Sequence, residues 1–445
     1  MSNILAIDIG SSKVCALIAR IEDDVPTVIG SGVARSQGLK KGAIVNIENV
    51  AKAIKSAISD ASRQAGIDHT RSIVSVSGAY ASSVDSQGIA SIPTKEITLK
   101  DINRAMQNAI YHASIPQEYD ILHALPYNFK VDEQSDVQDP VGMSGSRLEM
   151  SVHIIITQRS SLENLKKAIE AAGASIENLV LSGYASALSV LNEEEKDLGV
   201  CVIDMGGATS NMIIHCANAP RYNDFLSVGG MNVTTDLSYG LHTTLSAAER
   251  IKIEYGSLIT RSSATIDIPT TDSGTHPASL EVVSNVIHAR VEETLMILAS
   301  MLKKSQLKNS LGAGVVLTGG SSKHEGLADL ASPIFENISV RVARPKLIGG
   351  MTDALRDPIY AVVLGLVRYG AGESTLYEFD SSKNLRLKAN KSSEEEQHIQ
   401  KTAQNDQHIL LEKTNLADIT TIPKPENVSL ARRLKQFWEW LSKIF

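Results

Sequence analysis

Two short segments of the sequence combine an aspartate with a glycine turn, residue types that suit a metal-bound phosphate. In residues 6–13, Asp8 ends an apolar run, and a turn of small and basic residues follows it: Gly10, Ser11, Ser12 and Lys13. In residues 202–209, Asp204 takes the same place, and small residues follow it again: Gly206, Gly207, Ala208 and Thr209. Backbone N–H groups in such turns bind anions, and glycine permits their close approach. Either segment alone is typical of an ordinary tight turn, but their repetition favours a common phosphate ligand.

The two aspartates indicate that a divalent cation accompanies the phosphate, because a carboxylate beside a phosphate would otherwise repel it. Mg²⁺ accepts few protein ligands and keeps several waters. We therefore expect Asp8 and Asp204 to hold Mg²⁺ through bound water. Lys13 would add a point charge against the phosphates; the alternative for Lys13 is a lysine at a hairpin tip in solvent.

A third glycine turn follows the apolar residues 315–318 and consists of Gly319, Gly320 and Ser321. Two adjacent glycines allow the backbone to lie flat against a purine ring or a phosphate. The chain contains neither the GxxxxGK[ST] pattern of P-loop proteins nor the GxGxxG pattern of dinucleotide-binding folds, so both of these classes are excluded.

Alternating strands and helices are expected to position these turns. Apolar runs predict strands at residues 4–9 and 14–21, and apolar spacing predicts helices at 50–65 and 280–302. Capping-box patterns predict that three further helices begin at Thr98, Ser160 and Ser246. This alternation with short connections gives an α/β fold class for residues 1–371.

The ordered set of three turns resembles the phosphate-1, phosphate-2 and adenosine motifs of the actin, Hsp70 and sugar-kinase superfamily. Residues 181–188 and 357–365 resemble the two connecting helices of that superfamily. The resemblance implies an actin-like two-domain ATPase fold that closes on ATP and Mg²⁺.

Residues 123–132 and 139–149 resemble the small inserted α+β subdomain of the FtsA family of bacterial cell-division proteins. Within the second half, the turn at Gly229 and Gly230 resembles the glycine turn that this family places near the nucleotide. Glu249 and Lys252 resemble residues of the helix that contacts the ribose and adenine. Two alternatives remain open here: Glu249 completes a capping box with Ser246, and Lys252 lies on a solvated helix face.

The resemblance also implies a division of the chain. The expected parts are a first ATPase subdomain (1–82, 160–196 and 350–371), the inserted subdomain (83–159), a second ATPase subdomain (197–231 and 311–349) and a smaller subdomain (232–310). A disordered linker (372–427) and an amphipathic helix (428–445) are expected to follow, because the composition becomes polar and then amphipathic.

The last eighteen residues are predicted to form a membrane-surface helix. At a helical step of roughly 100° per residue, one apolar face collects bulky residues, with one arginine at its boundary: Leu430, Arg433, Leu434, Phe437, Trp438, Leu441, Ile444 and Phe445. An apolar face opposite a basic one is typical of interfacial helices. A terminal helix docked on the body and a calmodulin-type target helix are the alternatives.

Composition limits the possible functions. The 445 residues carry a net charge of −7, which argues against a nucleic-acid partner. Three cysteines without CxxC spacing suggest neither a disulfide framework nor a zinc site, and the N-terminus lacks the basic region of a secretory signal.

The resemblance implies an ATP-binding protein that polymerises on the cytoplasmic face of the inner membrane at the septum. Its implied partners are a second copy of itself, FtsZ, later division proteins and anionic lipid. ATP turnover is expected to be slow at most, and no catalytic residue is identified. An ATP-dependent small-molecule kinase is the alternative, but no candidate base is found. An Hsp70-like ATPase would need a β-rich domain that the chain lacks.

Overall fold

The computed structural model describes residues 2–68, 71–259, 263–269 and 274–388. The amphipathic helix predicted at 428–445 lies outside the described residues, as does the part of the predicted linker (372–427) that begins at residue 389. The described residues belong to one unit, Met1–Lys388, which contains three apolar cores.

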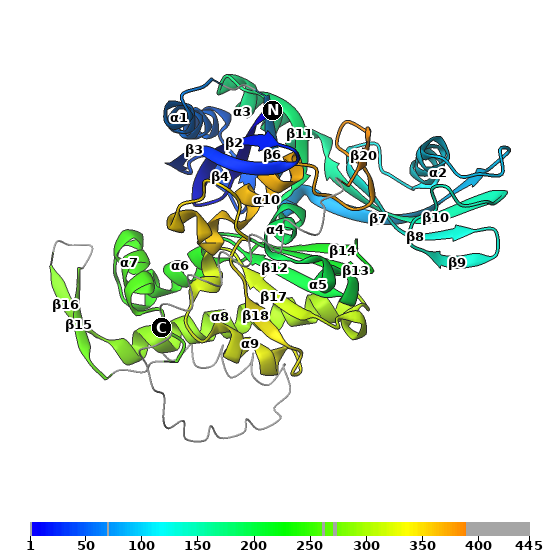
Figure 1. Ribbon diagram of the computed structural model, residues 1–445. Coiled ribbons are helices and arrows are strands. Elements are labelled where there is room, and N and C mark those ends of the chain that lie inside the picture. Colours follow the sequence, from blue (N-terminus) through cyan, green and yellow to red (C-terminus); the bar gives the residue numbers. More distant parts are fainter. Residues whose placement is uncertain (1, 69–70, 260–262, 270–273, 389–445) are drawn as a thin grey trace, which may run out of the picture. The chain divides into compact units, whose positions relative to one another are not determined.

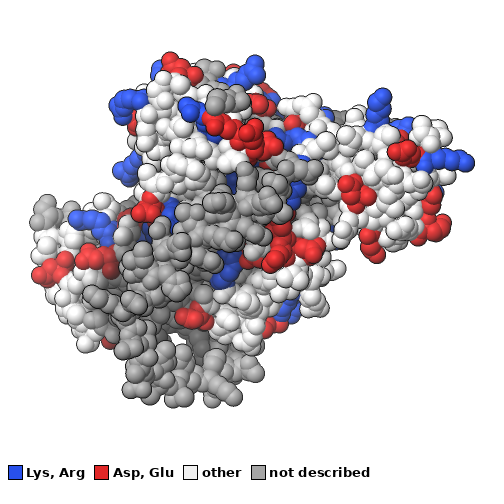
Figure 2. Space-filling view, in the orientation of Figure 1, with Lys and Arg blue, Asp and Glu red and all other residues white. Residues whose placement is uncertain are grey.

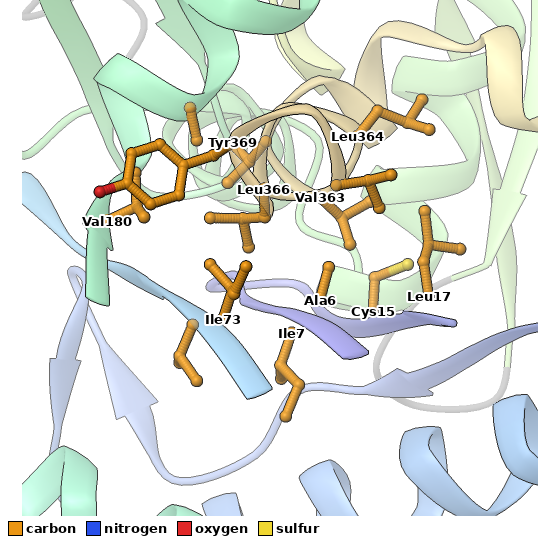
Figure 3. Packing of buried hydrophobic residues seen from close by; sticks show 14 of the residues in the cluster. Ala6, Ile7, Cys15, Leu17, Ile73, Val180, Val363, Leu364, Leu366 and Tyr369 are labelled. Atoms are coloured by element: carbon orange, nitrogen blue, oxygen red, sulfur yellow. The ribbon is translucent and has the colours of Figure 1, made fainter. Parts of the chain in front are cut away.

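The first core surrounds a five-stranded sheet of order β11-β6-β1-β2-β3. Its strands are β1 (Ser2–Ile9), β2 (Lys13–Glu22), β3 (Val25–Arg35), β6 (Arg71–Val76) and β11 (Ser175–Leu181). Helix α10 (Ala361–Gly370) packs on one face, against Ala6, Leu17 and Ile73 (Figure 3). Ile7 points to the opposite face, because successive strand residues alternate sides. Helices α1 (Ile47–Ala65) and α3 (Arg159–Ala171) pack on each other, and α1 also packs on β2 and β3 (Figure 1).

The second core surrounds a sheet that repeats the first one. Its order is β14-β13-β12-β17-β18, formed by β12 (Val200–Met205), β13 (Ser210–Cys216), β14 (Ala219–Leu226), β17 (Gly314–Thr318) and β18 (Val340–Val342). In both sheets the first hairpin is antiparallel, and the central strand then pairs in parallel with a later strand. The repetition seen in the glycine turns therefore extends to the whole sheet.

Four helices and a hairpin complete the second half: α6 (Gly230–Gly240), α7 (Leu245–Tyr255), α8 (Leu280–Lys304), α9 (Leu327–Ile334) and the strands β15 (Thr265–Pro269) and β16 (Thr275–Ser279). The apolar stripe of α8 is buried in the core, as its spacing predicts. Two shorter helices, α4 (Ser182–Val190) and α5 (Glu193–Leu198), connect the halves in sequence. The short elements are β4 (Leu39–Lys40), β5 (Ala43–Ile44) and the 3₁₀ turns η1 (Gly78–Tyr80), η2 (Lys308–Ser310), η3 (Gly320–Lys323), η4 (Asp353–Arg356) and η5 (Pro358–Tyr360).

The third core belongs to the inserted segment. Strands β7 (Ala81–Ser91), β8 (Tyr119–Val131) and β10 (Arg147–Gln158) form a sheet on which α2 (Leu99–His112) packs, and β9 (Gln134–Val137) pairs with β8. Thr98 begins α2 with the predicted capping box.

Two more strands, β19 (Tyr377–Phe379) and β20 (Leu385–Leu387), extend this inserted sheet beside β8. The interpretation of residues 372–388 as linker was therefore wrong. Tyr377 and Phe379 are buried, and Glu378 is fully buried between them. Its carboxylate lies 2.8 Å from His123 Nδ1 and accepts hydrogen bonds from the Tyr184 and Tyr369 hydroxyls at 3.1 and 2.8 Å. These contacts fix a segment whose polar composition is otherwise typical of a linker.

Two of the predicted capping boxes were wrong. Helix α3 begins at Arg159, so Ser160 lies inside its first turn. Helix α7 is capped by Thr244, whose hydroxyl accepts a hydrogen bond from the Ala247 N–H at 3.2 Å. Ser246 therefore does not cap that helix.

Within the described residues, no helix has both the length and the apolar composition needed to cross a bilayer. Acidic and basic side chains are interspersed over the described part of the face in Figure 2.

Candidate functional site

A cleft of about 570 Å³ collects residues from both repeated sheets. It is lined by most of the residues that the sequence predicts: Asp8, Gly10, Ser11, Ser12, Lys13, Asp204, Gly206, Gly207, Thr209, Gly230, Glu249, Lys252, Gly319, Gly320 and Ser321. Two predicted residues, Ala208 and Gly229, are not part of the lining. Three turns far apart in sequence thus contribute to one cavity.

The two hairpins at the cleft have the same local geometry. The N–H of Gly10 donates to the Lys13 carbonyl at 3.0 Å, and the N–H of Gly206 donates to the Thr209 carbonyl at 2.8 Å. A Cβ at Gly10 or Gly206 would lie 2.9 or 3.0 Å from the same carbonyl oxygens, so each turn favours glycine.

The tips of the two hairpins also meet across the cleft. A Cβ built on Gly207 would lie 3.2 Å from the Cβ of Ser12. The two turns that the sequence suggests as phosphate binders therefore face a common space.

Asp8 and Asp204 are both buried in the cleft wall. Burial raises the pKa of Asp8, while a 2.9 Å hydrogen bond from Ser75 and the charge of Lys13 oppose the rise. Burial also raises the pKa of Asp204 to about 7, and the negative charge of Asp8 adds to this rise. Such mutual repulsion means that the two carboxylates would be stabilised by a cation between them.

The donor set fits Mg²⁺ bound together with a phosphate. No group of three or more His, Cys, Asp or Glu side chains gathers into a metal site in the described part of the chain. Two carboxylates would therefore supply the protein's share, and phosphate and water oxygens would supply the rest, which is the coordination that Mg²⁺ favours.

Lys13 lies inside the protein rather than at a solvated hairpin tip. Its Nζ is buried, has no hydrogen-bond partner in the described part of the chain and lies 3.4 Å from the centre of the Tyr360 ring. Burial lowers the pKa of Lys13, whereas Cys15, Asp8 and Asp357 act in the opposite direction. The solvent alternative for this lysine was wrong.

The turn at Gly229 and Gly230 is hydrogen-bonded to the backbone of the second hairpin. The N–H of Gly230 donates to the Gly206 carbonyl at 3.0 Å, and the N–H of Met231 donates to the Gly207 carbonyl at 2.6 Å. Gly229 thus contacts the hairpin backbone instead of lining the cleft.

Glu249 and Lys252 form an ion pair on the side of α7 that lines the cleft. Lys252 Nζ lies 2.7 Å from Glu249 Oε2 and donates to the Thr234 hydroxyl at 3.0 Å and the Gly230 carbonyl at 3.2 Å. The Lys252 side chain is only 13% exposed, so the solvated-face alternative was wrong. The capping-box alternative for Glu249 was also wrong, because Thr244 caps the helix.

The third turn, at residues 319–321, packs against the second hairpin and is hydrogen-bonded to it. Gly319 has φ +86°, and a Cβ there would lie 2.3 Å from Asp204 Oδ1, so a side chain would displace that carboxylate. The Ser321 hydroxyl donates to the Gly206 carbonyl at 2.8 Å.

The cleft also contains residues that the sequence analysis did not select, among them Gly42, Ser77, Ser182, Asn211 and His324. Ser182 lies within residues 181–188, which resemble the first connecting helix, and Asn211 is the strand partner of Asp204 in the second hairpin. Both residues could therefore have been selected from the sequence. His324 Nδ1–H donates to the Gly256 carbonyl, 2.7 Å away. Nothing in the spacing of Gly42 or Ser77 distinguishes them from ordinary loop residues.

Comparisons with known proteins agree with this architecture. A family model described as "SHS2 domain inserted in FTSA" matches residues 78–156, and one described as "Cell division protein FtsA" matches residues 201–365. The cell division protein FtsA of Helicobacter pylori is 38% identical over 465 residues, covering 96% of this chain and 93% of the relative. That of Pseudomonas aeruginosa is 36% identical over 372 residues, covering 82% and 89%.

Solved structures show the fold. A chain of the PilM–PilN type IV pilus biogenesis complex matches with a TM-score of 0.61 and 18% identity, over 83% of this chain and 98% of that one. MreB5 of Spiroplasma citri, solved bound to ADP, matches with a TM-score of 0.50 and 14% identity, over 82% and 95%. The predicted actin-like fold with an inserted subdomain is therefore confirmed. Together with relatives of 36–38% identity along most of its length, this fold places the chain in the FtsA family of cell-division proteins.

Proposed function

We propose that this protein binds Mg-ATP between its two hairpins and, in that form, attaches FtsZ to the cytoplasmic face of the inner membrane at the septum. The observation that carries the proposal is the pair of matched hairpins, which bring Asp8 and Asp204 into one cleft. When bound, Mg²⁺ would neutralise phosphate charge. Asp8 and Asp204 would hold it, Lys13 would face the phosphates, and the turn at Gly319 and Gly320 would lie near the base.

Membrane attachment is proposed from the sequence of residues 428–445. Each Lys or Arg near an anionic leaflet contributes about 1 kcal/mol, and burial of the apolar face adds to this. One helix of this size binds reversibly, whereas several copies on one polymer bind far more tightly, because later contacts become intramolecular. We therefore propose that filament formation and membrane attachment reinforce each other, and that the assembled form recruits later division proteins.

The filament would form by head-to-tail stacking, a heterologous contact that does not close on itself. This part of the proposal rests on family membership and on the fold shared with MreB5. The FtsZ-binding surface is proposed to lie within residues 232–310.

Calorimetry of the full chain with ATP tests the nucleotide site. We expect binding to require Mg²⁺, and Asp204→Ala to weaken it at least about tenfold, a typical cost of losing a group that orients a metal. EDTA should weaken ATP binding to the parent protein but change little in Asp204→Ala, because both changes remove the same metal. If Asp204→Ala binds Mg-ATP like the parent, the assignment of this cleft fails.

A further inference from the structure

Tyr360 contacts Lys13, the residue that ends the first hairpin turn and lines the cleft. It is the last residue of η5 and precedes α10 directly. Its neighbours Pro358 and Ile359 line the cleft, whereas Tyr360 contacts Lys13 without being part of the lining. The Lys13 ammonium lies 3.4 Å from the ring centre, well within the range of a cation–π interaction.

The ring replaces the acidic partner that a buried lysine normally has. Lys13 Nζ is buried without a hydrogen-bond partner among the described residues. The nearby Asp357 carboxylate is already occupied, since it lies 2.5 Å from Lys323 Nζ and accepts the Ile359 N–H at 3.0 Å. Asp8 is held by Ser75 at 2.9 Å.

The geometry leaves the lysine able to bind a ligand. An ammonium group has three N–H donors. The ring covers one side of the group and leaves its N–H donors unused, and Lys13 belongs to the cleft lining although its Nζ is shielded from solvent beside the ring. A short movement of this flexible side chain would bring the unused donors to an anion that enters the cleft.

We propose that Tyr360 is a positioning residue whose ring face holds the Lys13 ammonium ready for the phosphates of a nucleoside polyphosphate. The inference rests on the proposed function, because it needs that ligand in this cleft. It predicts that ligand affinity depends on the electron density of the ring face and not only on the ring's shape. A ring that merely fills space beside the first core would show no such dependence.

Replacing Tyr360 with phenylalanine and then with its mono-, di- and trifluorinated forms tests this prediction. Fluorine weakens the negative ring face but changes the ring's shape little. We expect the Kd for Mg-ATP, measured by calorimetry, to rise with each fluorine, by about 2- to 30-fold over the series. Thermal unfolding of each form reports whether the fold is kept.

The same series in a Lys13→Met background is the control, because methionine fills similar space without charge. There the dependence on fluorine should vanish. If the Kd for Mg-ATP does not change with fluorination in the protein that keeps Lys13, Tyr360 does not have the proposed role. The proposed function still holds in that case, because the protein binds Mg-ATP. A parent protein that does not bind Mg-ATP overturns both.

Discussion

Gly229 lies against the backbone of Gly206 so closely that a Cβ on Gly229 would be 2.5 Å from the Gly206 carbonyl oxygen. The same Cβ would lie 2.8 Å from the Ala208 nitrogen. The second hairpin and the start of α6 are therefore built as one unit, and the shape of the proposed phosphate site depends on a residue that does not line it.

Gly229→Ala should weaken Mg-ATP binding by about tenfold or more, because the hairpin must move to accommodate the methyl group. It should also destabilise the fold by about 1–3 kcal/mol, as overpacking of a well-packed site does. Gly240→Ala at the other end of α6 is the matched control, since its Cβ would have no neighbour nearer than 3.9 Å. Calorimetry and urea unfolding measure both effects. Equal ATP affinity in the two variants would contradict this role of Gly229.

The contribution of Asp204 to stability without nucleotide should fall as the pH rises from about 4 to about 7. The pKa of Asp204 is about 7 in the folded protein, against 3.8 as its ordinary value. In this window Asp204 keeps a proton in the folded protein that it releases in the unfolded chain, so its contribution to the free energy of unfolding decreases, by at most about 1.4 kcal/mol per pH unit.

Asp204→Asn should remove this contribution to the pH dependence, because the amide does not titrate. The measurement is the urea midpoint of parent and variant between pH 4.5 and 8, without Mg²⁺ or nucleotide. The variant should gain stability relative to the parent as the pH rises. Parallel curves for the two proteins would show that Asp204 titrates normally.

Glu378→Ala should detach the β19–β20 hairpin from the inserted sheet. The change would leave His123, Tyr184 and Tyr369 without their buried acceptor, and an unsatisfied buried polar group costs about 1–3 kcal/mol. Glu133→Ala, at a fully exposed side chain, is the control. Hydrogen exchange should quicken in residues 377–387 and in β8 of the Glu378 variant alone. Unchanged protection there would mean that other contacts hold the hairpin.

The glycine turns and their hairpins could be predicted from the sequence because the signal is local: strand, aspartate, glycine and a second strand follow within about ten residues. Glu249 was ambiguous for the same reason, since a capping box and an i,i+3 ion pair with Lys252 use overlapping spacings. The contacts of Lys13 with Tyr360, and of His123 with Glu378, join residues far apart in sequence. No local pattern indicates them, and strands of three residues such as β19 and β20 are too short to show alternation.

Trp438→Glu should release the protein from anionic liposomes, because it places a charge in the centre of the proposed apolar face, where desolvation of a carboxylate is costly. Ser442→Glu adds the same charge on the proposed polar face and serves as the matched control. Flotation of both variants measures the effect. The parent's tryptophan fluorescence should shift to the blue on binding, and both tryptophans of the chain lie in this segment. Equal flotation of the two variants would favour a helix that docks on the body.

Flotation of FtsZ with anionic liposomes tests the central claim most directly. FtsZ is mixed with liposomes and Mg-ATP in the presence of the full chain, the Trp438→Glu variant or neither protein. FtsZ should float with the full chain and remain at the bottom of the gradient in the other two mixtures. If the full chain floats with its ATP bound and FtsZ still remains at the bottom, the protein does not attach FtsZ to the membrane.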